Sequence, residues 1–189
     1  MLAIFVGVRA EHHAADRRIE VLERRQLDDG YVLSRGTYQD SPVLVCRTGL
    51  GEERVNGIAD EIIHEHPVSA IVSARMASAI PASLNVGDLA FCLRSMLPRS
   101  GEDIIHQPSV EVDRRLLDLC GRAATSAGVP HVVGGCLTLA PLRPVPVNRE
   151  LAGEAGNVVV VDTPRSSTRY RFSRCASLWA KSTTACPKA

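Results

Sequence analysis

The sequence VLVCRTGLGEERVNGIADEIIHEHPVSAIVSARMASAIPASLNVGD occupies residues 43–88 and holds the clearest signal of a fold in this chain. It opens with an apolar run at 43–46 and continues through a glycine-containing turn at 48–51. A segment with helical periodicity, 52–65, and a second apolar run, 70–72, come next. This order of strand, glycine turn, helix and strand predicts a βαβ unit on a parallel sheet.

The helical segment has the spacing of an amphipathic helix. Its apolar residues recur at positions i, i+3, i+4, i+7 and i+8, while acidic residues occupy the opposite face. The apolar residues are Val55, Ile58, Ala59, Ile62 and Ile63. Pro67 follows and ends the helix, because proline cannot continue the hydrogen-bond ladder.

The same criteria predict further elements outside this stretch. They are strands at 2–8, 31–33, 88–93, 132–139 and 157–162, and helices at 14–27 and 112–127. We expect the strands at 31–33 and 43–46 to pair with each other, since only a polar turn separates them. Strands that alternate with helices in this way predict an α/β fold.

The composition is that of a soluble globular protein. The chain has 189 residues, of which 45% are hydrophobic and 23% charged, and this length suits one domain with a substantial core. No apolar run reaches the roughly 18–20 residues that cross a bilayer. The apolar start lacks the basic residues of a secretory signal. We therefore expect a cytoplasmic protein that does not contact a membrane.

The cysteines predict neither disulfides nor a metal site. No pair has the C-x-x-C spacing of a metal knuckle, and the first four lie within apolar patterns. The six are Cys46, Cys92, Cys120, Cys136, Cys175 and Cys186. We expect buried free thiols, because free cysteine packs as a small hydrophobic residue.

Residues 163–189 differ in composition from the rest of the chain. They contain four Arg, two Lys and no acidic residue, a net charge of +6, so residues 1–162 carry −5 of the total of +1. We expect a domain at 1–162 followed by an atypical basic tail at 163–189. Two interpretations of the tail stay open: a disordered end, and a segment translated in a shifted reading frame. Nucleic-acid binding is the less favoured role, because the tail has no recognisable docking motif.

Polar residues that follow the predicted strands are candidates for chemistry, because ligands bind at the carboxyl ends of parallel strands. Glu11 follows the first strand, where a partly buried carboxylate can act as a general acid or base; a solvated surface role is the alternative. The turn Gly49-Leu50-Gly51 precedes a helix and either holds an anion through its N–H groups or serves only as a tight turn.

Two further groups of polar residues have competing interpretations. His12 and His13 are candidates for a base or a ligand pair, although adjacent histidines in a loop are more often exposed. Arg47 and Arg75 each follow an apolar run and are candidates to bind a phosphate or a carboxylate.

Several features in sequence order resemble the purine and uridine phosphorylase and nucleosidase superfamily. A strand ends at Gly7 with Glu11 downstream, and the segment 45–51 leads into a helix. The element Val86-Gly87-Asp88 comes after a further strand and a small-residue segment, as it does in that family. The resemblance covers residues 1–162. The short chain and its Arg-Ala-Glu start look closest to the bacterial nucleosidases and the hopanoid-associated phosphorylase-like branch.

The resemblance implies a three-layer α/β/α sandwich with a central mixed sheet, usually oligomeric, that cleaves the N-glycosidic bond of a nucleoside. Water or inorganic phosphate would be the acceptor, and no metal or organic cofactor is implied. Glu11 matches the catalytic acidic residue near the sugar. The substrate-binding positions are Gly7, Arg47, Arg75, Ala77, Ser78 and Asp162. The expected partners are a nucleoside or nucleobase and further copies of this chain.

The chain also departs from the family's pattern. The family's Gly-x-Ala-Gly segment is replaced by Arg75-Met76-Ala77-Ser78, and its Met-Glu pair after Asp162 is replaced by Thr163-Pro164. No acidic residue follows Asp162. We therefore expect the fold to lack its final strand and helix. Two functions stay open: cleavage of a nucleoside with an incomplete active site, and a non-catalytic binding or interaction protein.

Overall fold

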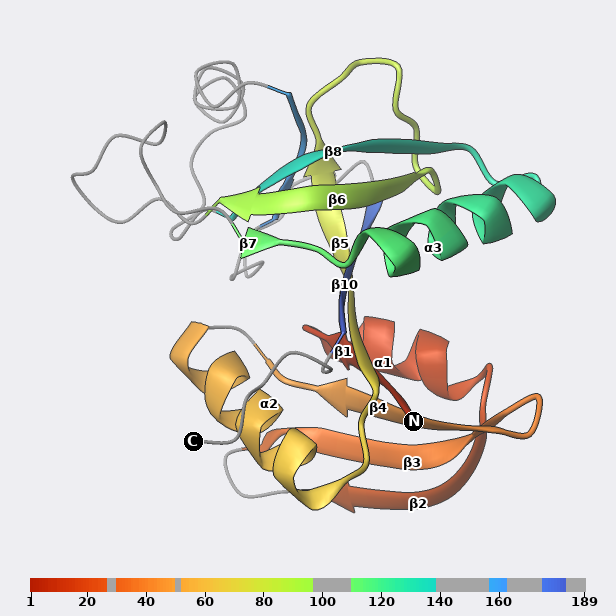
Figure 1. Ribbon diagram of the computed structural model, residues 1–189, viewed down its shortest axis with the longest axis vertical. Helices are drawn as coiled ribbons and strands as arrows, with labels where there is room; N and C mark the ends of the chain where they lie inside the picture. Colours follow the sequence, from red (N-terminus) through yellow and green to blue (C-terminus); the bar gives the residue numbers. More distant parts are fainter. Residues whose placement is uncertain (27–29, 50–51, 97–109, 139–156, 163–174, 183–189) are drawn as a thin grey trace. The chain divides into compact units, whose positions relative to one another are not determined.

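In the computed structural model, the described residues are 1–26, 30–49, 52–96, 110–138, 157–162 and 175–182 (Figure 1). The chain forms two compact units. Unit 1 comprises residues 1–74 and 180–189, and unit 2 comprises residues 75–179. The long strand β5 (Ala70–Ala79) begins in unit 1 and ends in unit 2.

The sheet of unit 1 is mixed and has the strand order β2-β3-β4-β1-β5 (Figure 1). Its strands are β1 (Leu2–Val6), β2 (Glu20–Gln26), β3 (Val32–Tyr38), β4 (Ser41–Arg47) and the first part of β5. Strand β1 lies between β4 and β5 and is parallel to both, while β3 is antiparallel to both β2 and β4. The predicted βαβ unit and the predicted pairing of the segments at 31–33 and 43–46 are therefore confirmed.

Helices α1 (Arg9–Asp16) and α2 (Glu52–Glu65) cover opposite faces of this sheet. In β4, Leu44 and Cys46 belong to the cluster that contains Ile58 and Ile62 of α2. The alternate residues of β4, Val43 and Val45, belong to the cluster against which Ala15 of α1 packs. Successive side chains of a strand point to opposite faces, so an uninterrupted apolar strand produces a helix–sheet–helix sandwich.

Unit 2 is built around a second set of paired strands, in the order β10-β6-β8-β9-β5. The strands not yet given are β6 (Leu89–Met96), β7 (Val110–Glu111), β8 (His131–Thr138), β9 (Val158–Asp162) and β10 (Cys175–Ser182). Strands β6, β8 and β9 are parallel to one another, and β7 is antiparallel to β6. The end of β5 is antiparallel to β9. The predicted α/β fold with a mixed sheet is confirmed.

Helix α3 (Arg114–Ser126) lies within the helix predicted at 112–127. The Asp113 carboxylate accepts hydrogen bonds from the backbone N–H groups of Arg115 and Leu116, at 2.9 and 3.1 Å, and so caps the N-terminus. Gly128 follows with φ of +65°, a conformation that glycine adopts at helix ends without strain. Leu119 of this helix is 52% exposed.

Three predicted boundaries are wrong because backbone pairing decides them. The helix expected at 14–27 ends at Asp16, and Glu20–Gln26 forms the edge strand β2, whose charged side chains leave its free edge solvated. The strand expected to stop near residue 73 continues to Ala79, since its end pairs with β9.

The third boundary concerns the tail. Strand β10 lies at Cys175–Ser182 and pairs in parallel with β6, although the sequence predicted no strand after Asp162. Its hydrogen-bonding partner is remote in sequence, and the composition of the tail does not reveal that partner. Residues 163–174 and 183–189 of the predicted tail lie outside the described residues.

Cys46, Cys92, Cys120 and Cys136 are free thiols, and all of these except Cys120 are buried, which confirms the prediction for Cys46, Cys92 and Cys136. Burial raises the pKa of the Cys46 thiol to about 12. Within the described ranges, no helix is long and apolar enough to span a membrane. The same ranges contain no group of His, Cys, Asp and Glu side chains that could hold a metal ion.

Candidate functional site

The carboxylate of Glu11 is fixed at the carboxyl end of β1. We expected Glu11 in a loop, but it lies in the first turn of α1 and is half-buried. Its Oε2 atom accepts hydrogen bonds from the backbone N–H groups of Gly7, at 2.7 Å, and Val8, at 2.9 Å. These donors belong to the turn between β1 and α1, and negative charge is favoured at a helix N-terminus. Gly7 and Glu11 are therefore in contact, as is required if both residues belong to one substrate site.

The end of β4 lies beside the end of β1. Arg47 pairs with Val6 in the parallel register, and its Nη2 atom donates a hydrogen bond to the Gly30 carbonyl oxygen at 3.0 Å. The next residue, Thr48, is fully buried, and its backbone N–H donates to the Val6 carbonyl oxygen at 3.0 Å. The carboxyl ends of both parallel strands thus converge on Gly7 and Arg47 within unit 1.

The glycine turn after β4 is described only at its start. Gly49 has φ of +69°, which side-chain-bearing residues rarely adopt, so glycine is required for the chain to leave β4 at this angle. The Thr48 hydroxyl donates to the carbonyl oxygens of Val6 or Gly49, at 3.3 and 3.2 Å. Leu50 and Gly51 lie outside the described residues.

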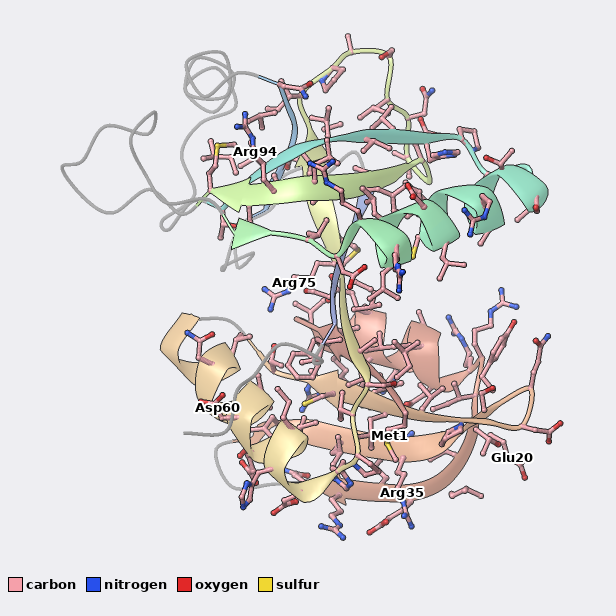
Figure 2. All side chains as sticks on the ribbon, in the orientation of Figure 1. Met1, Glu20, Arg35, Asp60, Arg75 and Arg94 are labelled. Atoms are coloured by element: carbon pink, nitrogen blue, oxygen red, sulfur yellow. The ribbon has the colours of Figure 1, made fainter. Side chains whose placement is uncertain are left out.

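The remaining predicted site residues belong to unit 2, where they lie on two neighbouring strands. Arg75, Ala77 and Ser78 are on β5, and Asp162 is the last residue of β9 (Figure 2 labels Arg75). Ser78 pairs with Val161 in the antiparallel register, so the backbone pairing brings Ser78 close to Asp162. The side chain of Ala77 is only 3% exposed and packs within an apolar cluster.

The Val86-Gly87-Asp88 element forms a turn that leads into β6. The Asp88 carboxylate accepts a hydrogen bond from the backbone N–H of Asn85 at 2.7 Å, and the Asp88 N–H donates to the Asn85 carbonyl oxygen at 3.2 Å. Gly87 has φ of +103°, which a side-chain-bearing residue would strain to adopt. The motif that carried much of the sequence resemblance therefore has a local structural role.

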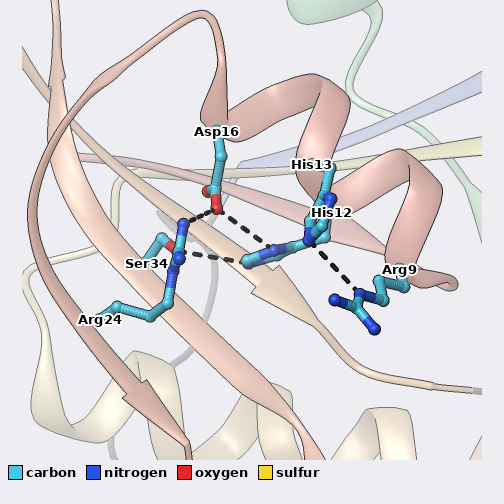
Figure 3. A network of polar contacts seen from close by, with 6 residues as sticks. All are labelled: Arg9, His12, His13, Asp16, Arg24 and Ser34. Carbon is cyan, nitrogen blue, oxygen red and sulfur yellow. Dashed lines mark hydrogen bonds and ion pairs between the residues drawn. The ribbon is translucent and has the colours of Figure 1, made fainter.

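The sequence patterns missed a buried polar cluster next to Glu11 (Figure 3). His12 is 2% exposed, whereas we had favoured exposed positions for both His12 and His13. Its Nδ1 atom lies 3.4 Å from Oδ2 of Asp16, and its Nε2 atom lies 3.3 Å from the hydroxyl of Ser34 on β3. Arg24 on β2 contacts both Asp16 and Ser34. His13 is exposed, as expected.

Burial lowers the pKa of the His12 imidazole below its usual value of 6.5. Desolvation of the charged form is the main cause, and the nearby cations Arg24 and Arg47 act in the same direction, while Asp16 opposes them. The folded protein therefore holds His12 neutral at a pH where the unfolded chain already binds a proton.

This difference predicts that acid destabilises the fold through His12. Between pH 6.5 and the lower folded pKa, the unfolded state binds more protons, so the free energy of unfolding falls as the pH falls, by at most about 1.4 kcal/mol per pH unit. Urea unfolding of the wild type and of His12→Gln between pH 7.5 and 5 measures this slope. We expect a flatter profile in the variant; equal slopes would exclude His12 as the source.

Comparison with known proteins identifies the fold but no close relative. No protein-family model and no curated protein matches the sequence. Among solved structures, a futalosine hydrolase mutant of Helicobacter pylori has a TM-score of 0.75 at 14% identity, covering 97% of this chain and 90% of that chain.

Two further solved structures have the same fold. The 5'-methylthioadenosine/S-adenosylhomocysteine nucleosidase of Neisseria meningitidis, bound to methylthio-immucillin-A, has a TM-score of 0.74 at 13% identity, with 94% of this chain and 83% of that chain covered. The purine nucleoside phosphorylase of Toxoplasma gondii, bound to immucillin-H, has a TM-score of 0.70 at 15% identity, with 94% of this chain and 74% of that chain covered. The chain therefore has the same fold as these solved hydrolases, nucleosidases and phosphorylases, which is the fold that the sequence resemblance predicted.

Proposed function

We propose that this protein cleaves the N-glycosidic bond of a nucleoside and releases the nucleobase. The observation that carries the proposal is the Glu11 carboxylate, held by the N–H groups of Gly7 and Val8 at the carboxyl end of a central parallel strand. Ligands bind at this edge in open α/β sheets, and solved proteins with this fold are nucleosidases and phosphorylases.

The proposed reaction requires charge stabilisation and two proton movements. The bond between C1' of the sugar and the base nitrogen breaks, and its electron pair leaves with the base. The C1' atom then develops positive charge, which a nearby carboxylate stabilises. In hydrolysis, an oxygen of water bonds to C1' while Glu11 accepts the proton of that water as a general base. In phosphorolysis, a phosphate oxygen takes the place of water and Arg47 is the proposed phosphate contact.

The departing base also needs a proton, and residues 163–189 contain no Asp or Glu side chain that could supply it. We therefore expect faster turnover of a substrate whose leaving group departs as a stable anion. Arg75, Ala77, Ser78 and Asp162 are the proposed substrate-binding positions. No metal or organic cofactor enters the proposed reaction, and a homo-oligomer is the proposed assembly.

The test is the release of free base from adenosine, inosine and methylthioadenosine, each with and without inorganic phosphate. A parallel assay uses p-nitrophenyl riboside, whose leaving group does not require protonation. Release of base or nitrophenol that scales with protein concentration supports the proposal, and dependence on phosphate identifies the acceptor. Absence of turnover with all four substrates at high protein concentration would exclude the proposed enzyme.

One observation favours a second function, a non-catalytic nucleobase-binding protein. The glycines that the family carries before Ala77 and at Ser78 are absent, and β5 runs through this segment with Arg75 half-buried and Met76 41% exposed. Larger side chains occupy space that glycine leaves open. Thermal stabilisation by adenine or adenosine without any release of base is the result that this alternative predicts. Stabilisation accompanied by turnover contradicts it.

A further inference from the structure

Four side chains form a closed ring of polar contacts that joins α1 to β2 and β3 (Figure 3). Arg24 Nε donates to the Ser34 hydroxyl at 3.4 Å, and that hydroxyl lies 3.3 Å from Nε2 of His12. Nδ1 of His12 lies 3.4 Å from Oδ2 of Asp16, which also accepts a hydrogen bond from Arg24 Nη2. Three of its members lie away from water, because Ser34 is fully buried, His12 is 2% exposed and the Asp16 side chain is 8% exposed, while the Arg24 side chain closes the ring from the surface at 54% exposure.

The donors and acceptors of this ring define the state of His12. A carboxylate only accepts hydrogen bonds, so Oδ2 of Asp16 at 3.4 Å from Nδ1 favours the His12 tautomer that carries its proton on Nδ1. The Nε2 atom is then an acceptor and receives the hydroxyl proton of Ser34, whose oxygen in turn accepts from Arg24. With His12 neutral, each of the four contacts joins a donor to an acceptor. The other Asp16 oxygen, Oδ1, is buried and has no hydrogen-bond partner among the described residues, so Oδ2 anchors this carboxylate to the ring.

Helix α1 depends on such anchoring. It has only eight residues, and helices shorter than about 12–15 residues are marginal without tertiary contacts. Glu11 and His12 are adjacent in this helix, and the backbone N–H of His12 donates to the Val8 carbonyl oxygen at 3.1 Å. Val8 also donates its own N–H to the Glu11 carboxylate. A shift of His12 therefore moves the turn that holds Glu11.

We propose that His12 is a positioning residue: as the neutral Nδ1–H tautomer it ties α1 to β2 and β3 and so fixes the Glu11 carboxylate at the end of β1. The catalytic consequence rests on the proposed function, whereas the anchoring of Glu11 does not.

Protonation of His12 acts against this arrangement. The charged groups around it are Asp16 and His13 on α1, Arg24 on β2 and Arg47 on β4, and of these only Asp16 favours an imidazolium. A second ring proton at Nε2 would also displace the hydrogen bond that the Ser34 hydroxyl donates. We therefore expect α1 to loosen, and Glu11 with it, as the pH falls below the neutral range.

The first experiment needs no enzymatic activity. Long-range proton–nitrogen spectra of the imidazole ring identify the tautomer, and hydrogen exchange reports on the Gly7 and Val8 amides that hold Glu11. We expect the Nδ1–H tautomer at pH 7.5 and at least 10-fold faster exchange of both amides in His12→Gln. His13→Gln, one residue along the same helix but exposed, is the matched control and should leave both rates within 2-fold. If His12→Gln fails to fold, Ser34→Ala tests the same link. An Nε2–H tautomer, or unchanged exchange in the variants that fold, overturns the proposal.

The second experiment uses the substrate with the fastest turnover. A displaced catalytic group costs up to about 100-fold in rate, so we expect His12→Gln to lower kcat 10- to 100-fold with little change in KM. The variant should also lose the part of the acid limb of the kcat profile that comes from His12 and keep the part that comes from the Glu11 base. His13→Gln should retain the wild-type values. A wild type without turnover contradicts the proposed function and leaves the amide-exchange result to decide the positioning role. Wild-type kcat in His12→Gln, with turnover present, overturns the catalytic part of this inference.

Discussion

Glu11→Gln is expected to lower kcat/KM for base release by about 100- to 10,000-fold, the range over which general acid–base groups contribute to catalysis. The amide is isosteric with the carboxylate, and its oxygen can still accept the hydrogen bonds of Gly7 and Val8. What the variant loses is the negative charge beside the developing cation at C1' and the capacity to accept a proton. The loss should therefore appear in kcat more than in KM.

Steady-state kinetics with purified variants measures this effect, and Glu65→Gln is the matched control. Glu65 is exposed at the end of α2, so its substitution by Gln makes the same chemical change without affecting the turn after β1. Thermal unfolding of Glu11→Gln should show a folded protein close to the wild type in stability, since the backbone hydrogen bonds remain. Activity of Glu11→Gln within 3-fold of the wild type would remove Glu11 from the mechanism.

Gly36→Ala is expected to give the largest change in stability, a loss of about 2–3 kcal/mol in the free energy of unfolding, as for overpacked positions. Gly36 is buried in β3, opposite Val21 of β2 and Val43 of β4. A Cβ atom at this position would overlap the backbone carbonyl oxygen of Glu20 and lie 3.0 Å from its carbonyl carbon. Backbone atoms cannot rotate away as a side chain can, so β2 must separate from β3.

Urea unfolding measures the change, and Gly57→Ala provides a control for the loss of a glycine. Gly57 is exposed within α2, and a Cβ atom there would meet nothing within 4 Å. Alanine in a helix interior is favoured over glycine by about 0.5–1 kcal/mol, so this variant should be more stable than the wild type. Equal stability of Gly36→Ala and the wild type would show that β2 and β3 pair less closely than described.

The local sequence pattern was sufficient to predict the strands and the helix at the centre of unit 1. The apolar residues of β4 and the helical spacing of Ile58 and Ile62 are set by neighbours in sequence, and each element buries the face that its pattern marks. Helix α3 was predicted for the same reason, since the spacing of its apolar residues is set within the helix itself.

Pattern failed where a remote strand supplies the hydrogen bonds. Strand β2 carries three charged side chains in succession, Glu23, Arg24 and Arg25, a pattern that favours a solvated helix. Its pairing with β3, which the pattern does not show, makes it a strand. Strand β10 lies in a basic segment without periodicity and pairs with β6, which is far away in sequence. Propensity is a weak guide when a partner strand satisfies the backbone.

The same distinction between local pattern and remote partners applies to the candidate site. The sequence by itself determined that Gly7 and Glu11 follow a buried strand, because the apolar run before them and the residues after it are contiguous. It also indicated the βαβ order of β4, α2 and β5, whereas the placement of β1 between β4 and β5 appears only in the structure. Only the tertiary structure decided that His12 is buried while His13 is exposed, because Ser34 and Arg24, which complete its hydrogen bonds, come from strands that fold back onto α1. Adjacent histidines in a sequence are chemically identical; the strands against which one of them packs make it different.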